Sequence, residues 1–407
     1  MPDPAVGSAG DGNAEVVEIV FDGLRQISPD PQALSERLRA RLALPAGEAD
    51  RLLYETIARI HLQLFPPITQ VELILTEACN LRCRYCFETT MLGSSSMAAE
   101  TGRRAVDLLV RYSANEPRLS VTFFGGEPIL RLSTMEEIAR YARRRAAVGG
   151  KEVDFNTTTN GTLITDRVAE VLAEQRIKAL LSLDGLDTSH DRFRVDRRGR
   201  GSFAAVVRGL RRLKAVQPWI AAKMTVMPEN VSRLCEDVRG LHDLGVNQFI
   251  IGHATGVRWD QPDMDAFAAQ WRDLCRWYRD HRNADLLIED LEKEESPGSY
   301  FGCQAGRTGI SVSVDGDVSP CSKLLALDKT RALGRLGDLR HGLTHLTNRF
   351  EVVGAEGVRA AWTAVGSEIP YRGGCFAENF EENGALFQPS LQEHRFSALR
   401  AEASSRA

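Results

Sequence analysis

Short apolar runs alternate with amphipathic segments through the middle of this chain. Between the runs, apolar positions return at the helical period, as in Ala105, Leu108, Leu109 and Tyr112, which fall on one helix face. Runs bounded by turn residues predict buried strands at residues 71–75, 119–124, 153–158, 179–183, 221–226 and 249–252. Six strand–helix units in series predict parallel strands joined by right-handed crossovers, and therefore an α/β barrel or partial barrel. Such a fold carries its chemistry at the carboxyl ends of the strands.

The two ends of the chain have weaker patterns. Residues 17–21 suggest a strand, and residues 31–42 and 48–64 suggest two helices. Residues 310–318 alternate apolar and polar positions around an Asp-Gly pair, which predicts a β-hairpin. The tail at residues 388–407 is polar, so we expect it to be disordered or to become helical only on docking.

Composition and charge narrow the classes of protein. The chain has 407 residues, a formal net charge of −4 and no dense block of Lys or Arg, which argues against nucleic acid as a partner. No apolar run approaches the ~20 residues that a membrane span needs. Residues 1–14 are acidic and rich in Gly, Pro and Ala, unlike a signal peptide. Eight cysteines in a chain of this length do not suggest a disulfide scaffold, so we expect a cytoplasmic protein with reduced thiols and no membrane partner.

Three cysteines stand close together directly after the first predicted strand. Cys79, Cys83 and Cys86 are spaced C-x3-C-x2-C on one short loop. Thiolates are the usual ligands of a [4Fe–4S] cluster, and three of them would leave the fourth iron open to a small molecule. A structural zinc site needs a fourth Cys or His nearby, and the next histidine is His190. The spacing therefore favours an iron–sulfur cluster over zinc or a disulfide.

Glycines and polar residues follow several of the predicted strands. The second strand ends in a Gly-Gly-Glu-Pro segment, where glycine permits close approach of a ligand and a carboxylate accepts hydrogen bonds from an ammonium. A plain Gly-Pro turn is the structural alternative. The next two strands end in Asn-Gly and Asp-Gly pairs, which are ordinary turns on their own. The candidate cofactor-binding residues at these strand ends are Gly125, Gly126, Glu127, Asn160, Ser182, Asp184, Arg194 and Val226.

Together, the cysteine loop and the strand-end motifs resemble the radical S-adenosylmethionine (radical SAM) family, whose core is a partial (β/α)6 TIM-like barrel. By this resemblance, the open iron chelates the methionine end of S-adenosylmethionine and the Gly-Gly-Glu-Pro segment grips its amino group. Ser182 and Arg194 would contact the methionine carboxylate or the ribose, and Val226 would lie against the adenine, although it is as readily core. An electron from the cluster would cleave the cofactor to a 5′-deoxyadenosyl radical, which abstracts hydrogen from substrate. The Ser-x-Asp-Gly, His-Asp-x-x-Arg and Gly-Ser-Phe segments within residues 182–203 resemble the subgroup that modifies peptides and proteins.

A second group of cysteines lies in the C-terminal third. The predicted hairpin brings Cys303 and Cys321 together, and Cys375 follows a Gly-Gly pair. This region resembles the SPASM/twitch extension of the radical SAM family, which binds auxiliary Fe–S clusters. The full pattern has more cysteines and two clusters, and Arg372 stands where the family usually has a further cysteine. The resemblance implies a single auxiliary [4Fe–4S] cluster on Cys303, Cys321 and Cys375, with its fourth ligand unidentified; a retained fold that has lost the cluster is the alternative.

We expect four parts along the chain. They are an N-terminal extension at residues 1–67, a radical SAM core barrel at 68–283, a SPASM/twitch-like domain at 284–387 and a polar tail at 388–407. Peptide-modifying relatives often carry a small module that binds the leader of a precursor peptide. Residues 1–67 are a short candidate for that module.

The resemblance implies a radical SAM maturase of ribosomally made peptides (RiPPs) that closes a C–C or thioether cross-link. Its partners would be a precursor peptide and an electron donor of the flavodoxin or ferredoxin type. The alternatives are Ser or Cys oxidation as in anaerobic sulfatase maturation, peptide epimerisation, dehydrogenation of a small metabolite, and a leader-binding scaffold without chemistry. Cys235 and Cys275 are expected to be buried structural thiols, with hydrogen-atom donation in epimerisation as the alternative. His253 is a candidate substrate contact or a structural histidine.

Overall fold

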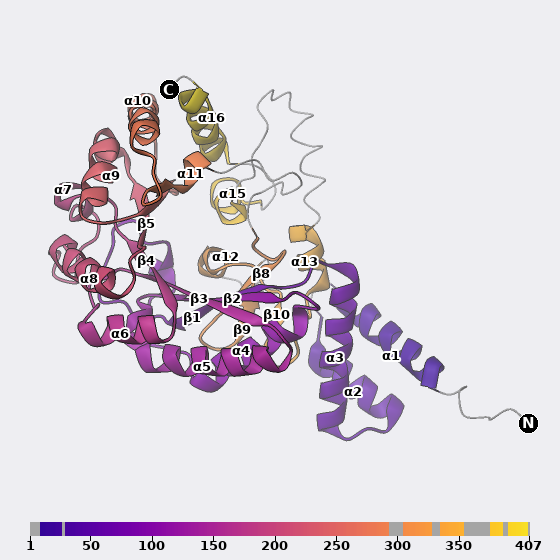
Figure 1. Ribbon diagram of the computed structural model, residues 1–407. Helices are drawn as coiled ribbons and strands as arrows, with labels where there is room; N and C mark the ends of the chain where they lie inside the picture. Colours follow the sequence, from indigo (N-terminus) through magenta and orange to yellow (C-terminus); the bar gives the residue numbers. More distant parts are fainter. Residues whose placement is uncertain are drawn as a thin grey trace, which may run out of the picture.

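The computed structural model of the protein describes residues 9–26, 29–292, 304–327, 334–353, 375–385 and 390–405. In this part of the chain, ten strands form one sheet in the order β10-β9-β8-β1-β2-β3-β4-β5-β6-β7 (Figure 1). Neighbours from β8 through β1 to β7 are parallel, whereas β9 and β10 pair antiparallel. The strands are β1 Gln70–Thr76, β2 Arg118–Gly125, β3 Glu152–Thr159, β4 Ile177–Ser182, β5 Ala221–Val226, β6 Gln248–His253, β7 Leu287–Ile288, β8 Gly309–Val312, β9 Asp317–Ser319 and β10 Gly337–Asp338.

Strands β1 to β6 alternate with helices, and this confirms the predicted α/β fold with parallel strands. Five of the six predicted apolar runs lie within one of these strands, and the run at residues 179–183 extends one residue past the end of β4. The main helices are α4 Ala99–Tyr112, α5 Leu132–Val148, α6 Asp166–Glu174, α8 Phe203–Val216, α9 Leu234–Asp243 and α10 Gln261–His281. Shorter helices are η1 Phe87–Thr90, η2 Pro128–Arg131, α7 Asp187–His190, η3 Pro228–Arg233 and α11 Glu289–Glu292.

Alternation along the strands separates the core from the opposite face of the sheet. On β2, Leu119, Val121 and Phe123 are buried, whereas Ser120 and Thr122 between them are only half-buried. Phe123 stacks on Phe155 of β3, with ring centroids 6.1 Å apart. The buried residues join those of the helices in one large hydrophobic core.

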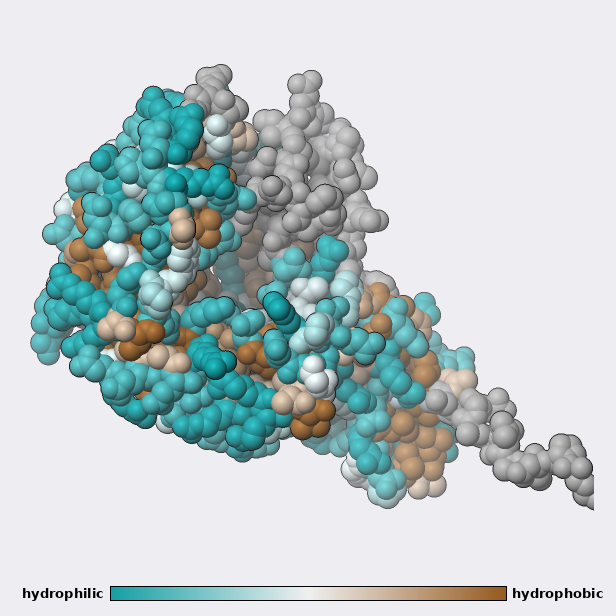
Figure 2. Space-filling view, viewed as in Figure 1, coloured by the Kyte–Doolittle hydropathy of each residue, from teal (hydrophilic) through white to brown (hydrophobic). Residues whose placement is uncertain are grey.

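The N-terminal residues form three helices, α1 Ala9–Leu24, α2 Pro31–Leu42 and α3 Ala46–Leu64. The predicted strand at residues 17–21 is wrong, because these residues belong to α1. Val16, Val20 and Leu24 recur at every fourth position and are buried with residues of α2 and α3. The apolar positions therefore form the buried face of a helix. In Figure 2, hydrophobic surface gathers over these three helices.

The C-terminal residues extend the same sheet. Strands β8 and β9 form the predicted β-hairpin, and β8 pairs in parallel with β1. Among the described residues that follow are the helices α12 Ser322–Leu327, α13 Leu346–Val353 and α15 Phe376–Asn383. The final helix, α16 Leu391–Ser405, packs on α10 with Phe396 fully buried, so the polar tail is docked rather than disordered. None of the helices described is both long and apolar enough to cross a membrane.

Candidate functional site

The loop after β1 carries the three cysteines of the predicted cluster site. It pairs with the segment around residue 195: the Arg82 amide donates to the Val195 carbonyl over 2.7 Å, and the Arg84 amide donates to the Phe193 carbonyl over 2.9 Å. These backbone hydrogen bonds hold the loop in a defined shape.

The thiols of this loop lie close enough for their charges to interact. Burial raises the pKa of Cys79 to about 12 and that of Cys86 to about 11, and it also raises the pKa of Cys83. Thiolates at such a site need the positive charge of a metal. Three thiols on one ordered loop are a donor set that fits a [4Fe–4S] cluster with one iron left free.

The double glycine after β2 packs directly against this loop. Gly125 has a φ of +109°, and a Cβ there would lie 2.4 Å from the Thr76 carbonyl oxygen. A Cβ on Gly126 would lie 2.4 Å from the carbonyl oxygen of Ala78. Only glycine fits either position, so the pair brings two strand ends together under the cysteines.

Glu127 ties the same corner to β3. Its carboxylate accepts hydrogen bonds from the Thr159 hydroxyl at 2.7 Å, the Asn160 amide at 2.8 Å and the Ile129 amide at 3.1 Å. Burial raises the pKa of Glu127 to about 7 despite these donors. Two carboxylate oxygens have about four acceptor positions, so one position remains for an ammonium group.

Asn160 reaches from β3 to the start of the cysteine loop. Its side-chain amide donates to Asn80 Oδ1 over 2.9 Å and lies 4.0 Å from Cys79 Sγ. The Asn80 amide in turn donates to the Thr162 hydroxyl over 2.8 Å. The predicted Asn-Gly turn therefore positions the first cysteine.

Arg194 and Asp184 form a buried ion pair beside the second cysteine. Arg194 donates from Nε and Nη2 to the two oxygens of Asp184 at 2.8 and 3.1 Å, and its Nη1 lies 4.0 Å from Cys83 Sγ. Tyr85 donates its hydroxyl to the same carboxylate, and the guanidinium lies over the Tyr85 ring. Through Tyr85, Asp184 and Arg194 hold the cysteine loop against the segment that follows β4, where Ser182 is half-buried at the strand end.

Behind the ion pair, a neutral histidine fixes the Arg194 backbone. His190 Nδ1 accepts from the Asp184 amide at 3.4 Å, so its Nε2 donates to the Ser202 hydroxyl at 2.9 Å. The Ser202 hydroxyl in turn donates a hydrogen bond to the Arg194 carbonyl over 2.8 Å. Burial lowers the pKa of His190 to about 3, which keeps the ring neutral.

Buried carboxyl groups gather next to the cysteine loop. Burial, together with the charges of Glu72 and Glu127, raises the pKa of Glu88 to about 8. The neighbouring Glu72 accepts from the Ser311 hydroxyl of β8 at 2.6 Å. This corner of the sheet is therefore acidic and suits a cationic ligand.

The remaining candidates lie in three different surroundings. Val226 is buried in the main core, and its predicted contact with adenine stays a prediction. Cys235 is half-buried and lines an open groove of about 590 Å³ between α9 and α10. Cys275 is buried in α10 beside Ser404 of α16, with the Sγ and Oγ atoms 3.7 Å apart. His253, at the carboxyl end of β6, is buried among aromatic side chains.

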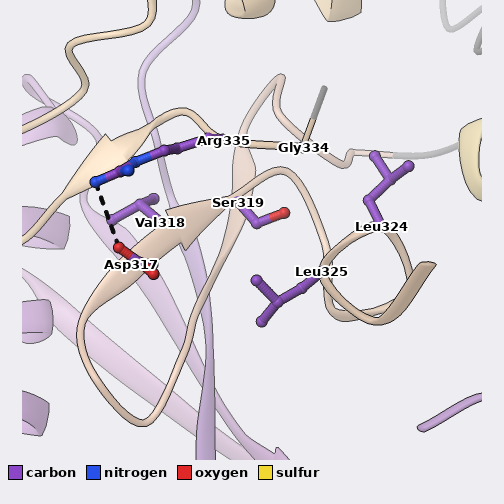
Figure 3. A pocket seen from close by; sticks show the side chains of 7 residues that line it. All are labelled: Asp317, Val318, Ser319, Leu324, Leu325, Gly334 and Arg335. Carbon is purple, nitrogen blue, oxygen red and sulfur yellow. Dashed lines mark ion pairs between the residues drawn. The ribbon is translucent and has the colours of Figure 1, made fainter. Parts of the chain in front are cut away.

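The predicted auxiliary site lies partly outside the described residues, since Cys303 falls there. Cys321 and Cys375 directly precede α12 and α15, and these two helices pack against each other. A cavity of about 10 Å³ lies behind the hairpin, where Arg335 pairs with Asp317 at 3.5 Å (Figure 3). It has room for about one water molecule.

Sequence reasoning missed several residues of the site. Tyr85 and Asn80 stand inside the cysteine loop itself, and Glu88 follows the last cysteine by two positions. Their position next to the candidate metal ligands could have marked these residues as part of the site. The partners that bury them come from distant segments, which a single sequence does not reveal.

Comparison with known proteins agrees with this geometry. Residues 73–241 match the sequence model of the Radical SAM superfamily. The matching stretch includes the three cysteines of the loop, the double glycine and the buried ion pair.

Curated relatives include several enzymes. The radical SAM cyclopropyl synthase TigE of Paramaledivibacter caminithermalis is 26% identical over 168 residues, 38% of this chain and 34% of TigE. The serine-type anaerobic sulfatase-maturating enzyme of Bacteroides thetaiotaomicron is 31% identical over 33% of this chain and 34% of that enzyme. The cysteine-type enzyme of Clostridium perfringens is 26% identical over 67% of this chain and 79% of that enzyme. The chain therefore spans about a third of the length of the first two relatives.

Solved structures share the fold. The structure of anSMEcpe with bound AdoMet has a TM-score of 0.66 at 22% identity, covering 84% of this chain and 94% of that one. The structure of anSMEcpe with bound AdoMet and the Kp18Cys peptide has a TM-score of 0.65 at 22% identity, covering 84% and 98%.

Proposed function

We propose that this protein is a radical SAM enzyme that modifies a ribosomally made peptide, closing a C–C or thioether cross-link. One observation carries the proposal: Cys79, Cys83 and Cys86 lie on one ordered loop at the carboxyl end of a parallel sheet, next to a buried acidic corner. Chemistry is expected at this end of such a sheet. The open order of the sheet supports a partial (β/α)6 barrel.

The chain's own residues would hold the cluster and the cofactor. The three thiols bind the irons, while Gly126, Asn160 and Arg194 fix the loop that carries them. When bound, the cluster and S-adenosylmethionine supply the one-electron chemistry that removes an unactivated hydrogen atom.

The acidic corner suits the charge of that cofactor. S-adenosylmethionine carries an ammonium and a sulfonium, and Glu72, Glu88 and Glu127 provide carboxylates near the cysteine loop. A bound cation would favour the charged form of Glu127 and Glu88, opposing the effect of burial. Arg194 already donates two hydrogen bonds to the two carboxylate oxygens of Asp184. We therefore infer that Arg194 orients the cofactor by holding the cysteine loop in place as well as by direct contact.

A peptide substrate is supported by the relatives. Sulfatase-maturating enzymes act on a protein, and the cysteine-type enzyme aligns over most of its length. Ser or Cys oxidation is therefore the second candidate function. An electron donor of the flavodoxin or ferredoxin type, a cytoplasmic location and leader binding by residues 1–67 remain proposals.

Reconstitution under anaerobic conditions tests the reaction class. With S-adenosylmethionine and dithionite, the protein should form 5′-deoxyadenosine, and a variant with Cys79→Ala, Cys83→Ala and Cys86→Ala should form none. The matched control is Cys235→Ala, which changes a cysteine of helix α9 and should still form 5′-deoxyadenosine. Undiminished formation in the triple variant would refute the proposal.

Mass spectrometry of a modified peptide separates the two candidate functions. A short peptide encoded beside this gene should lose two hydrogen atoms and gain a cross-link between two of its residues. A sulfatase-derived peptide should stay unchanged. Conversion of its Ser or Cys to an aldehyde instead would establish the second candidate.

A further inference from the structure

A histidine and two glutamates converge where β6, α15 and α16 meet, away from the cysteine loop in sequence. His253 ends β6, Glu378 belongs to α15 and Glu393 to α16. One ligand atom of each residue lies within 4.8 Å of the other two. His253 is more than a hundred residues away from either glutamate in the chain, so the fold itself brings the histidine to them.

The histidine is buried without a hydrogen-bond partner. Its side chain is 4% exposed, and neither ring nitrogen makes a hydrogen bond within the described residues. Glu393 Oε2 is 3.5 Å from His253 Nε2, and this contact does not form a hydrogen bond. Buried polar atoms are nearly always satisfied, so these nitrogens point to a missing ligand.

Packing holds the imidazole in one orientation. The Phe396 ring stacks on it with centroids 3.8 Å apart and an interplanar angle of 12°, and Trp259 meets it edge-on. An imidazole held in one orientation, with both ring nitrogens lacking hydrogen bonds to the described residues, is placed to ligate a metal.

We propose that His253, Glu378 and Glu393 bind a divalent transition-metal ion, with a ligand set that includes none of the cysteines of the predicted iron–sulfur clusters. One imidazole and two carboxylates are borderline-to-hard ligands, which suit Mn²⁺, Fe²⁺ or Zn²⁺. Three protein ligands leave further positions for water or substrate. The ion would fasten α15 and α16 to the end of β6.

The ammonium group of a lysine lies at the edge of this site and pairs with one of the proposed ligands. Lys323 Nζ lies 3.3 Å from Glu378 Oε1 and 2.7 Å from the Thr255 hydroxyl. It neutralises Glu378 while the ion is absent and repels the ion when it arrives. Removing its charge should therefore strengthen metal binding, an effect opposite to that of removing a ligand.

Manganese binding to the full-length protein tests the proposal without an activity assay. Mn²⁺ is the probe because thiolates favour softer metals, so the cysteine sites compete weakly. The EPR signal of free Mn²⁺ should report about one bound ion per chain, and added Zn²⁺ should displace it. His253→Gln and Glu393→Gln should each weaken binding more than about tenfold. Lys323→Met should tighten it about tenfold.

A matched control and a second readout keep the result interpretable. His242→Gln changes a half-buried histidine whose Nδ1 already contacts the Val246 carbonyl, and it should leave Mn²⁺ binding unchanged. Metal should raise the unfolding temperature of the wild type but not that of His253→Gln. No binding by the wild type, or equal binding by His253→Gln, would overturn the site. Binding unchanged by Lys323→Met would exclude Glu378 as a ligand and overturn it as proposed.

Discussion

At the scale of single residues, the cysteine loop depends on contacts that leave no room for larger side chains. Gly126 approaches the Ala78 carbonyl so closely that one added carbon would lie 2.4 Å from the oxygen. The loop must then shift, because the contact is with backbone. Arg194 and Asp184 fix the other end of the loop through a pair that is buried and fully hydrogen-bonded.

Gly126→Ala should therefore disturb the cluster site more than the fold. We expect iron content after reconstitution to fall by about half or more, and 5′-deoxyadenosine formation by at least about tenfold, since a displaced ligand set loses reactive geometry. Gly47→Ala is the control, because nothing lies within 4 Å of a Cβ there. Equal iron content in both variants would show that the close approach does not position the cysteines.

His190 gives the protein a pH dependence of known sign. Burial lowers its pKa from 6.5 to about 3 in the folded state. The group therefore contributes full stability above about pH 6.5, and that contribution is lost as pH falls toward 3. From pH 7 to pH 5 this amounts to about 2 kcal/mol of unfolding free energy.

Urea unfolding at the two pH values measures this effect. His190→Gln carries no titrating group, so its loss of stability between pH 7 and pH 5 should be smaller by about 2 kcal/mol than that of the wild type. The same loss in both proteins would mean that His190 is not the buried neutral group described here.

At the scale of elements, the sequence predicted the six central strands and the helices at residues 31–42 and 48–64, and it failed at the strand expected at residues 17–21. All six apolar runs became strands, because a parallel strand buried on one side by helices needs a compact apolar stretch. Residues 17–21 were misassigned because a short β-branched run suits a strand or a buried helix face, and length alone decides. Of the two expectations for the tail, the docked helix is the one that the structure shows, because Phe396 finds partners on α10 and β6.

In the candidate site too, some features could be predicted from the sequence and others could not. The cysteine spacing and the double glycine are local signals, and they identified the loop and its neighbour. The pairing of Arg194 with Asp184, and of Tyr85 with both, joins separate segments that no spacing rule connects. For that reason Arg194 was predicted only as a free cofactor contact.

Helix α16 should be held by one aromatic residue. Phe396 is fully buried against His253, Trp259 and Phe267. Phe396→Ala should cost about 3–5 kcal/mol and release α16, making residues 391–405 sensitive to protease. Leu391→Ala, at a side chain that is 63% exposed, should be near neutral. Equal protease resistance in the two variants would contradict this anchoring role.

At the scale of the whole molecule, the C-terminal region is continuous with the sheet and touches the cysteine loop. Strand β8 pairs with β1, which leads into that loop. Helix α12, directly after Cys321, packs on η1 directly after Cys86, and the Thr90 hydroxyl donates to the Ala326 carbonyl over 2.8 Å. The two predicted cluster regions therefore share one rigid boundary.

This arrangement sets the expected result when the auxiliary cysteines are removed. If both clusters are [4Fe–4S], the reconstituted protein should hold about eight irons per chain. The Cys303→Ala, Cys321→Ala and Cys375→Ala triple variant should hold about four. It should still form 5′-deoxyadenosine slowly, because Cys79, Cys83 and Cys86 remain, but it should lose peptide product. Iron analysis, electron paramagnetic resonance and product mass spectrometry on the same samples measure all three. Eight irons retained in the variant would remove the auxiliary site, whereas loss of all iron would mean that the C-terminal cysteines are needed to build the first site.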